Sequence, residues 1–216
     1  MNAKVDNALK RLTSILPLQA RQQDCNAEIQ ALHRQILASF VTQGRILSRE
    51  QIAEHVSDLE EAISVLKSHD LVVFSGNGDP VGAYPFTMDA REHEVRINGH
   101  KVHAMCALDA LAVSPMFGMK TKVCSTCRVS GDPVTIEQSG NTIENQDEAG
   151  AVHFGIIWGA ANPCFCCADS LCMEMMFLRD DRIAQQWLAE DPGNREIFTL
   201  PEAVEFGARF FVPLMS

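Results

Sequence analysis

The pattern of apolar residues changes near residue 90, and this change constrains the fold more than any other feature of the chain. Before it, apolar residues recur at helical spacing, and after it short β-prone runs alternate with turn signals. The helical runs cover residues 1–24, 26–41, 48–56 and 58–66, and Pro17 is expected to end the first helix. Helices followed by hairpins predict an α+β fold. We place the boundary near Asp89, between a helical subdomain at 1–89 and an α+β domain at 90–216.

The N-terminal segment has the element order of a winged helix. Ser48 and Gln51 form a predicted capping box, Asp58 is placed to cap the next helix, and predicted strands at 71–74 and 81–86 flank a turn. A helical cap with the same topology is the alternative. Between residues 26 and 90 there are four Lys and Arg against nine Asp and Glu, a net charge of −5. Because DNA binding requires cations that neutralise phosphates, we expect no nucleic-acid partner.

The rest of the chain predicts a mixed or antiparallel sheet with surrounding helices, the expected catalytic part of the protein. Asn98-Gly99 joins two β-prone runs and is a strong hairpin signal. Strands are predicted at 95–97, 101–103, 120–124, 133–136, 152–158 and 196–200. Helices are predicted at 106–112, 166–177, 181–188 and 201–210. The polar, acidic stretch 141–150 is expected to be a surface loop.

Charge and cysteine content exclude several classes of function. The chain has 216 residues, a formal net charge of −10 and 46% hydrophobic residues, enough for a sizeable core. Such an acidic protein is unsuited to nucleic acid or to an anionic membrane. We see neither a secretory signal nor an apolar run that could span a bilayer, and we expect a cytoplasmic protein. In that reducing compartment its eight cysteines are expected to bind metal, act as nucleophiles or lie buried, rather than form disulfides.

Cys106 and Asp109 form the first candidate site. They lie three residues apart in a predicted helix and therefore share one of its faces. Asp109 stands between Leu108 and Leu111 in an apolar stretch, where an unpaired carboxylate is costly. We expect it to have a raised pKa and a partner, for which the neighbouring thiol is suited. The ordinary alternative is a small buried cysteine beside a surface carboxylate.

A second group of thiols comprises Cys164, Cys166 and Cys167. We predict that it opens a helix, whose N-terminus lowers the pKa of a thiol. A structural zinc site that combines Cys164 and Cys166 with Cys124 and Cys127 is the alternative, although the later group lacks the usual spacing. The seven histidines show no pattern of metal-ligating pairs. The remaining thiols are most simply buried: Cys25 and Cys172.

Three motifs in order resemble the organomercurial lyases, also called alkylmercury lyases. The segment 106–111, Cys-Ala-Leu-Asp-Ala-Leu, is similar to the family's helix with its first cysteine and its aspartate. The segment 127–134 resembles its third cysteine and the following strand, and Phe-Cys-Cys at 165–167 resembles the segment with the second catalytic thiol, here Cys166. The resemblance extends from Tyr84 to the C-terminus, and the family also carries a winged-helix-like N-terminal part.

The resemblance implies an enzyme of mercury resistance and detoxification. It would cleave the carbon–mercury bond of alkyl- and arylmercury compounds by protonolysis, giving a hydrocarbon and Hg(II). Cys106 and Cys166 would bind the metal as thiolates, and Asp109 would relay the proton and complete the site that holds Hg(II). The resemblance implies no cofactor, low-molecular-weight thiols that remove the product, a mercuric reductase that accepts it, and a structural role for Cys127.

The chain departs from the family pattern in two ways. Met105 stands where the family carries an aromatic residue, and Cys124, Cys164 and Cys172 are additional thiols that could retain mercury or speed its removal. Three other functions stay open: a non-enzymatic thiol protein that binds copper(I), zinc or mercury, a metal-responsive winged-helix repressor, and a cysteine hydrolase. For the hydrolase, no histidine is placed to act as a base for Cys106.

Overall fold

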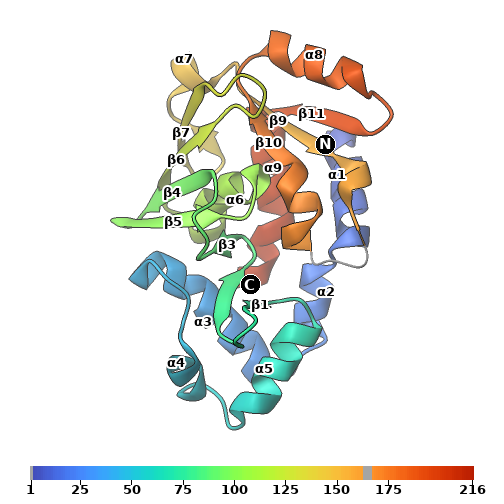
Figure 1. The fold of residues 1–216 in the computed structure, drawn as a ribbon. Helices are drawn as coiled ribbons and strands as arrows, with labels where there is room; N and C mark the ends of the chain where they lie inside the picture. Colours follow the sequence, from blue (N-terminus) through green and yellow to red (C-terminus); the bar gives the residue numbers. More distant parts are fainter. Residues whose placement is uncertain (1, 163–166) are drawn as a thin grey trace.

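The computed structural model describes residues 2–162 and 167–216 and has the predicted α+β architecture (Figure 1). The chain begins with five helices, α1 (Ala3–Ile15), α2 (Leu18–Gln23), α3 (Ala27–Gln43), α4 (Arg49–Ala53) and α5 (Leu59–Ser68). The first predicted run, 1–24, is one helix only as far as Ile15, and the predicted end at Pro17 is confirmed. Leu16 leaves the helical region (φ −130°, ψ 83°) because the residue before a proline, here Pro17, avoids that conformation.

Side-chain caps fix where these helices begin. The Asn26 side chain accepts a hydrogen bond from the backbone N–H of Ile29 at the start of α3. Ser48 and Gln51 form the predicted capping box of α4, and Asp58 caps α5 as predicted. Each cap satisfies backbone donors that have no partner within the helix.

The larger sheet is antiparallel and has the strand order β1-β2-β3-β5-β4-β6-β7-β8. Its strands are β1 (Val73–Phe74), β2 (Pro80–Ala83), β3 (Phe86–Thr87), β4 (His93–Ile97), β5 (His100–Ala104), β6 (Lys120–Thr126), β7 (Pro133–Ser139) and β8 (Thr142–Ile143). The predicted hairpin turn is confirmed, since Asn98 and Gly99 adopt φ values of 50° and 77°. The expected loop at 141–150 is partly wrong, because it contains β8 and the short helix α7 (Gln146–Ala149).

A second, three-stranded antiparallel sheet has the order β10-β9-β11. Its strands are β9 (His153–Ile157), β10 (Met175–Leu178) and β11 (Arg195–Thr199). The prediction of a helix over 166–177 is wrong for the residues described. The chain forms two 3-10 turns, η2 (Cys167–Asp169) and η3 (Leu171–Glu174), and then β10, because pairing with β9 outweighs the local helical preference. Helix α8 (Asp181–Glu190) then covers this sheet on its outer side (Figure 1).

Helix α6 (Ala107–Phe117) occupies the centre of the core. Every residue from 107 to 114 is buried, and a helix that is apolar on all sides must lie in the interior. It packs against β6 and β10 from the two sheets and against α9 (Leu200–Phe211), which runs through the middle of the molecule in Figure 1. A Cβ on Gly207 would lie 3.2 Å from the Ala112 Cβ and from the Leu108 carbonyl oxygen, so a glycine permits this close approach.

Segments that precede residue 89 in the sequence pack against segments that follow it. Strands β1 to β3 share the sheet of β4 and β5, and α1 packs against α9. The division into 1–89 and 90–216 therefore stays a prediction about the sequence rather than a visible separation. Among the described residues no helix is both long and apolar enough to cross a bilayer.

Candidate active site

The first predicted thiol and the predicted carboxyl meet at the start of α6. After β5 the chain turns, and Cys106 becomes the N-cap of the helix with extended backbone (φ −152°, ψ 177°). Its Sγ accepts a hydrogen bond from the Asp109 backbone N–H, with 3.4 Å between the two atoms. A thiol thus occupies the N-cap position, where Ser, Thr, Asp or Asn is usual, and Asp109 is the third residue of the helix.

Asp109 is a buried acid without a full set of partners. Its side chain is 2% exposed, and Oδ2 has no hydrogen-bond partner among the residues that the structure describes. Burial raises the pKa of Asp109 to about 7, opposed by a hydrogen bond with Cys106 and by the charge of Arg91. The predicted rise is confirmed in direction, and the carboxyl can exchange a proton near neutral pH.

A second described thiol joins this pair, and it is Cys172 from η3. The Sγ atoms of Cys106 and Cys172 and a carboxylate oxygen of Asp109 all lie within 4.8 Å of one another. Cys106 is completely buried, and burial raises its pKa to about 11. Its thiol also contacts Met175 Sδ at 3.4 Å. This soft, buried donor set suits a thiophilic metal ion better than a hard one.

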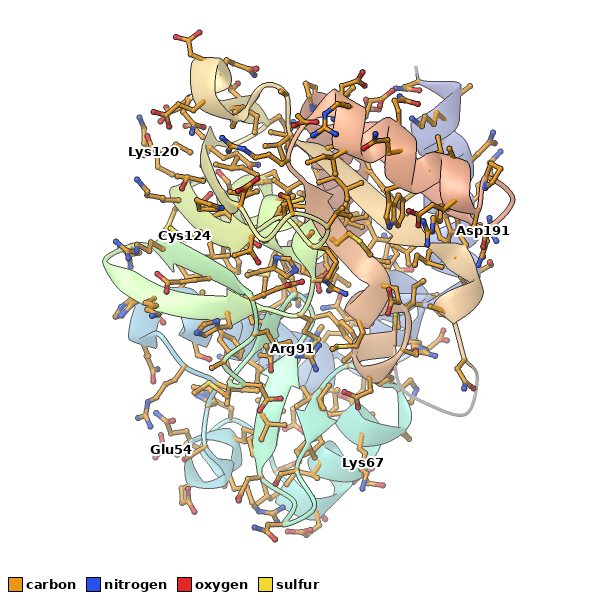
Figure 2. The ribbon with its side chains drawn as sticks, turned by 45° about the horizontal axis from the view of Figure 1, so that its top comes forward. Glu54, Lys67, Arg91, Lys120, Cys124 and Asp191 are labelled. Atoms are coloured by element: carbon orange, nitrogen blue, oxygen red, sulfur yellow. The ribbon has the colours of Figure 1, made fainter. Side chains whose placement is uncertain are left out.

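A further thiol, Cys167, extends the group. Its Sγ lies 3.6 Å from that of Cys172. Two side chains from connections between strands of the larger sheet hold the η2 turn in place: Tyr84 follows β2, and Arg91 precedes β4. Arg91 donates hydrogen bonds to the carbonyl oxygens of Met105 (3.2 Å) and Ala168 (2.8 Å), and Tyr84 Oη accepts one from the Ala168 N–H (3.0 Å). Figure 2 labels Arg91 near the centre of the molecule.

Solvent reaches the thiols through two depressions. One, of about 340 Å³, is lined by Cys172 with Arg91, His93 and Met105. The other, of about 360 Å³, is lined by Cys167 with Arg21 and others. Cys106 lines neither, which agrees with its complete burial.

The other predicted residues fall into two groups. Cys164 and Cys166 lie outside the described residues. Cys127 is buried, and its Sγ accepts hydrogen bonds from the backbone N–H groups of Ser130 (3.4 Å) and Arg179 (3.3 Å). These bonds outweigh burial and lower the pKa of the Cys127 thiol.

The described residues give little support to the zinc and hydrolase alternatives. Among them, Cys124 and Cys127 belong to no group of three metal-ligating side chains, and no histidine joins Cys106. His93 instead contacts Ser125 Oγ (2.8 Å) and Glu92 (3.2 Å).

The sequence leaves the place of Cys172 open, because it fits an ordinary buried thiol on a predicted helix as well as an additional thiol that could retain mercury or speed its removal. Cys172 follows Cys106 by more than sixty positions and matches no motif, so the sequence does not place it beside Cys106 and Asp109. The one available signal was the density of soft side chains after residue 163, which includes Cys167, Cys172 and Met175. Only the packing of β10 against α6 brings these sulfur atoms to Cys106.

The fold and the site together define an α+β protein with a buried centre of thiols and one carboxyl, a donor set of the kind that suits a soft metal. A family model described as alkylmercury lyase matches residues 86–212, and the chain belongs to this family. The chain is 26% identical over 149 residues to the alkylmercury lyases of Bacillus cereus and Clostridium butyricum, covering 69% of this chain. It spans 66%, about two thirds, of the length of those two relatives.

Two further comparisons agree with this family. The alkylmercury lyase of Staphylococcus epidermidis is 24% identical over 172 residues, which are 79% of this chain and 77% of that protein. The crystal structure of the mercury-bound form of MerB2 superposes with a TM-score of 0.72 at 16% identity, covering 92% of this chain and 98% of that one. At that identity the likeness concerns the fold alone.

Proposed function

We propose that this protein is an organomercurial lyase that cleaves the carbon–mercury bond of alkyl- and arylmercury compounds by protonolysis. Membership of the alkylmercury lyase family supports the reaction class. The observation that carries the proposal is the Asp109 carboxyl, buried beside two thiols, with an unpartnered Oδ2 among the described residues and a pKa of about 7. Such an acid can take a proton from a thiol and give it to carbon in a site without bulk water.

The reaction begins with ligand exchange at mercury. R–Hg⁺ arrives bound to a small thiolate, and the Cys106 sulfur replaces that thiolate. The Cys106 proton moves to the Asp109 carboxylate. The two residues are already in contact, since the Asp109 backbone N–H donates a hydrogen bond to the Cys106 sulfur at 3.4 Å. With a pKa of about 11, Cys106 keeps its proton until the metal binds.

Cleavage follows when a second thiolate binds the metal. The family resemblance assigns this role to Cys166, and that assignment stays a proposal. Two thiolates raise the electron density on mercury and weaken its bond to carbon. The electron pair of the Hg–C bond takes the proton from Asp109, R–H leaves, and Hg(II) stays on the two sulfurs beside the carboxylate.

Release of Hg(II) completes the cycle. We propose that low-molecular-weight thiols remove the metal and that a mercuric reductase is the final acceptor, without any cofactor in the lyase itself. We also propose a cytoplasmic location. The six described cysteines are all free thiols, a state that a reducing compartment maintains.

The test is incubation of the purified chain with phenylmercury and excess thiol, with benzene measured by gas chromatography. We expect catalytic benzene release from the wild type and from Cys124→Ser, in which a partly exposed thiol on β6 is removed. Cys106→Ser should lose the activity because a hydroxyl is a poor mercury ligand, and Asp109→Asn should bind the organomercurial without cleaving it. Stoichiometric metal binding with no benzene would instead support a thiol-based metal-binding or metal-sensing protein.

A further inference from the structure

Three of the described thiols, Cys106, Cys172 and Cys167, form a chain of neighbours whose exposure to solvent increases from the first to the last. The Cys106 and Cys172 sulfurs lie within 4.8 Å, and Cys172 and Cys167 are 3.6 Å apart. Their exposure rises in the same order, from 0% for Cys106 to 4% for Cys172 and 7% for Cys167. Cys106, the thiol that carries the proposed chemistry, is therefore the one that an external thiol reaches least easily.

These spacings suit transfer of one soft ion from sulfur to sulfur. A metal–thiolate bond of roughly 2.3 Å, as zinc makes, allows two sulfurs of one ion to lie up to about 4.6 Å apart. The separations of both pairs are close to or below this limit, so an ion on Cys106 can bind Cys172 before it leaves the first sulfur. The same holds for the step from Cys172 to Cys167.

The surroundings favour an outlet on the Cys167 side. The depression that Cys167 lines also carries Ser14 from α1, Arg21 from α2 and Ser170, which lies between η2 and η3. Arg91 and Tyr84 hold the η2 turn through Ala168, so the Cys167 sulfur stays next to Cys172. Cys172 lines the separate depression beside Arg91 and His93. Substrate and product thus have different openings available.

We infer that Cys172 and Cys167 form a relay that carries the Hg(II) product from Cys106 to the Cys167 depression, where a small thiol takes it. This inference rests on the proposed lyase function and names the route of product release. Each step exchanges one sulfur for another: Cys172 bonds to Hg(II) and gives its proton to the sulfur of Cys106 as that sulfur leaves, and Cys167 then displaces a second ligand in the same way. No electron transfer is involved.

The test uses the full chain loaded with one equivalent of mercuric chloride and mixed with excess glutathione. Loss of the sulfur-to-mercury charge-transfer absorption is followed by stopped flow. Relative to the wild type, Cys167→Ser and Cys172→Ser should each release the metal about tenfold more slowly. Each variant lacks one sulfur that binds the metal during its transfer, and the barrier to release is therefore higher. Cys124→Ser is the matched control and should release it at the wild-type rate. Release from Cys167→Ser or Cys172→Ser that is as fast as or faster than the wild type overturns the relay.

A second measurement separates the relay from the lyase function. In a Cys106→Ser background, which is expected to be inactive, mercury should still be retained against a competing dithiol. Adding Cys172→Ser should reduce that retention, whereas adding Cys124→Ser should not, and equal retention in the two double variants overturns the relay. If the wild type produces no benzene but the release rates depend on Cys167 and Cys172, the lyase proposal fails and the relay stands.

A third measurement is thiol counting on freshly reduced protein. A disulfide between Cys167 and Cys172 in that protein overturns the relay directly.

Discussion

Replacing Asp109 by asparagine should make the protein more stable above neutral pH while it removes the proton relay. The side chain is 2% exposed, and burial raises its pKa to about 7, whereas an unfolded aspartate titrates near 3.9. Below about pH 4 both states hold the proton, and the group has no effect on stability. Between about pH 4 and 7 only the unfolded state ionises, so the free energy of unfolding falls by roughly 1.4 kcal/mol per pH unit.

The magnitude follows from the shift of about three units. Above pH 7 the native state carries an ionised, buried carboxyl, and the full destabilisation is about 4 kcal/mol. Groups that titrate alike in both proteins cancel in the difference between wild type and Asp109→Asn. That difference should grow by roughly 2–3 kcal/mol from pH 5 to pH 8 in favour of the variant. Urea unfolding at several pH values measures it. Parallel stability curves for the two proteins over this range would refute the assignment of a raised pKa to Asp109.

Three further substitutions have distinct expected results. Arg91→Met removes the cation that lowers the pKa of Asp109, so the falling part of the stability–pH curve should extend to higher pH in urea titrations. Tyr84→Phe leaves the Ala168 N–H without its acceptor and should lower the free energy of unfolding by about 1–3 kcal/mol in the same assay; an unchanged free energy would contradict this role of the hydroxyl. Cys127→Ala removes the acceptor of two backbone N–H groups; it should lower the thermal midpoint by several degrees, while single-turnover benzene release from the folded protein stays at the wild-type rate.

Local signals in the sequence predicted much of the fold. The capping box at Ser48, the Asn98-Gly99 turn and the apolar stretch after Cys106 each act within a few residues, and the structure has the elements they indicate. The errors lie where distant partners decide. Residues 175–178 have no local preference strong enough to predict β10, which exists because β9 provides hydrogen bonds along its whole length.

The candidate site divides in the same way. Cys106 and Asp109 could be predicted because three positions separate them and an acid in an apolar helix is conspicuous. The actual geometry still differs from two residues on one helical face, since Cys106 is the N-cap and its sulfur binds the Asp109 N–H. Cys172 could be named as an additional thiol but not placed beside Cys106, because that nearness depends on how β10 packs against α6. The assignment of Cys166 stays a prediction from the family motif.

A site that breaks a carbon–mercury bond faces opposing demands on affinity. Two thiolates must bind the metal strongly enough to weaken its bond to carbon, yet the same strength and the complete burial of Cys106 slow the departure of Hg(II). Neighbouring sulfurs resolve this conflict kinetically, because each exchange forms one metal–sulfur bond as another breaks and never exposes a bare ion. The tight site can then remain buried, with its acid near pKa 7, while the more exposed Cys167 meets the external thiol. The cysteine that reacts can therefore stay buried, because a different cysteine in the same chain of neighbouring sulfurs passes the product to solvent.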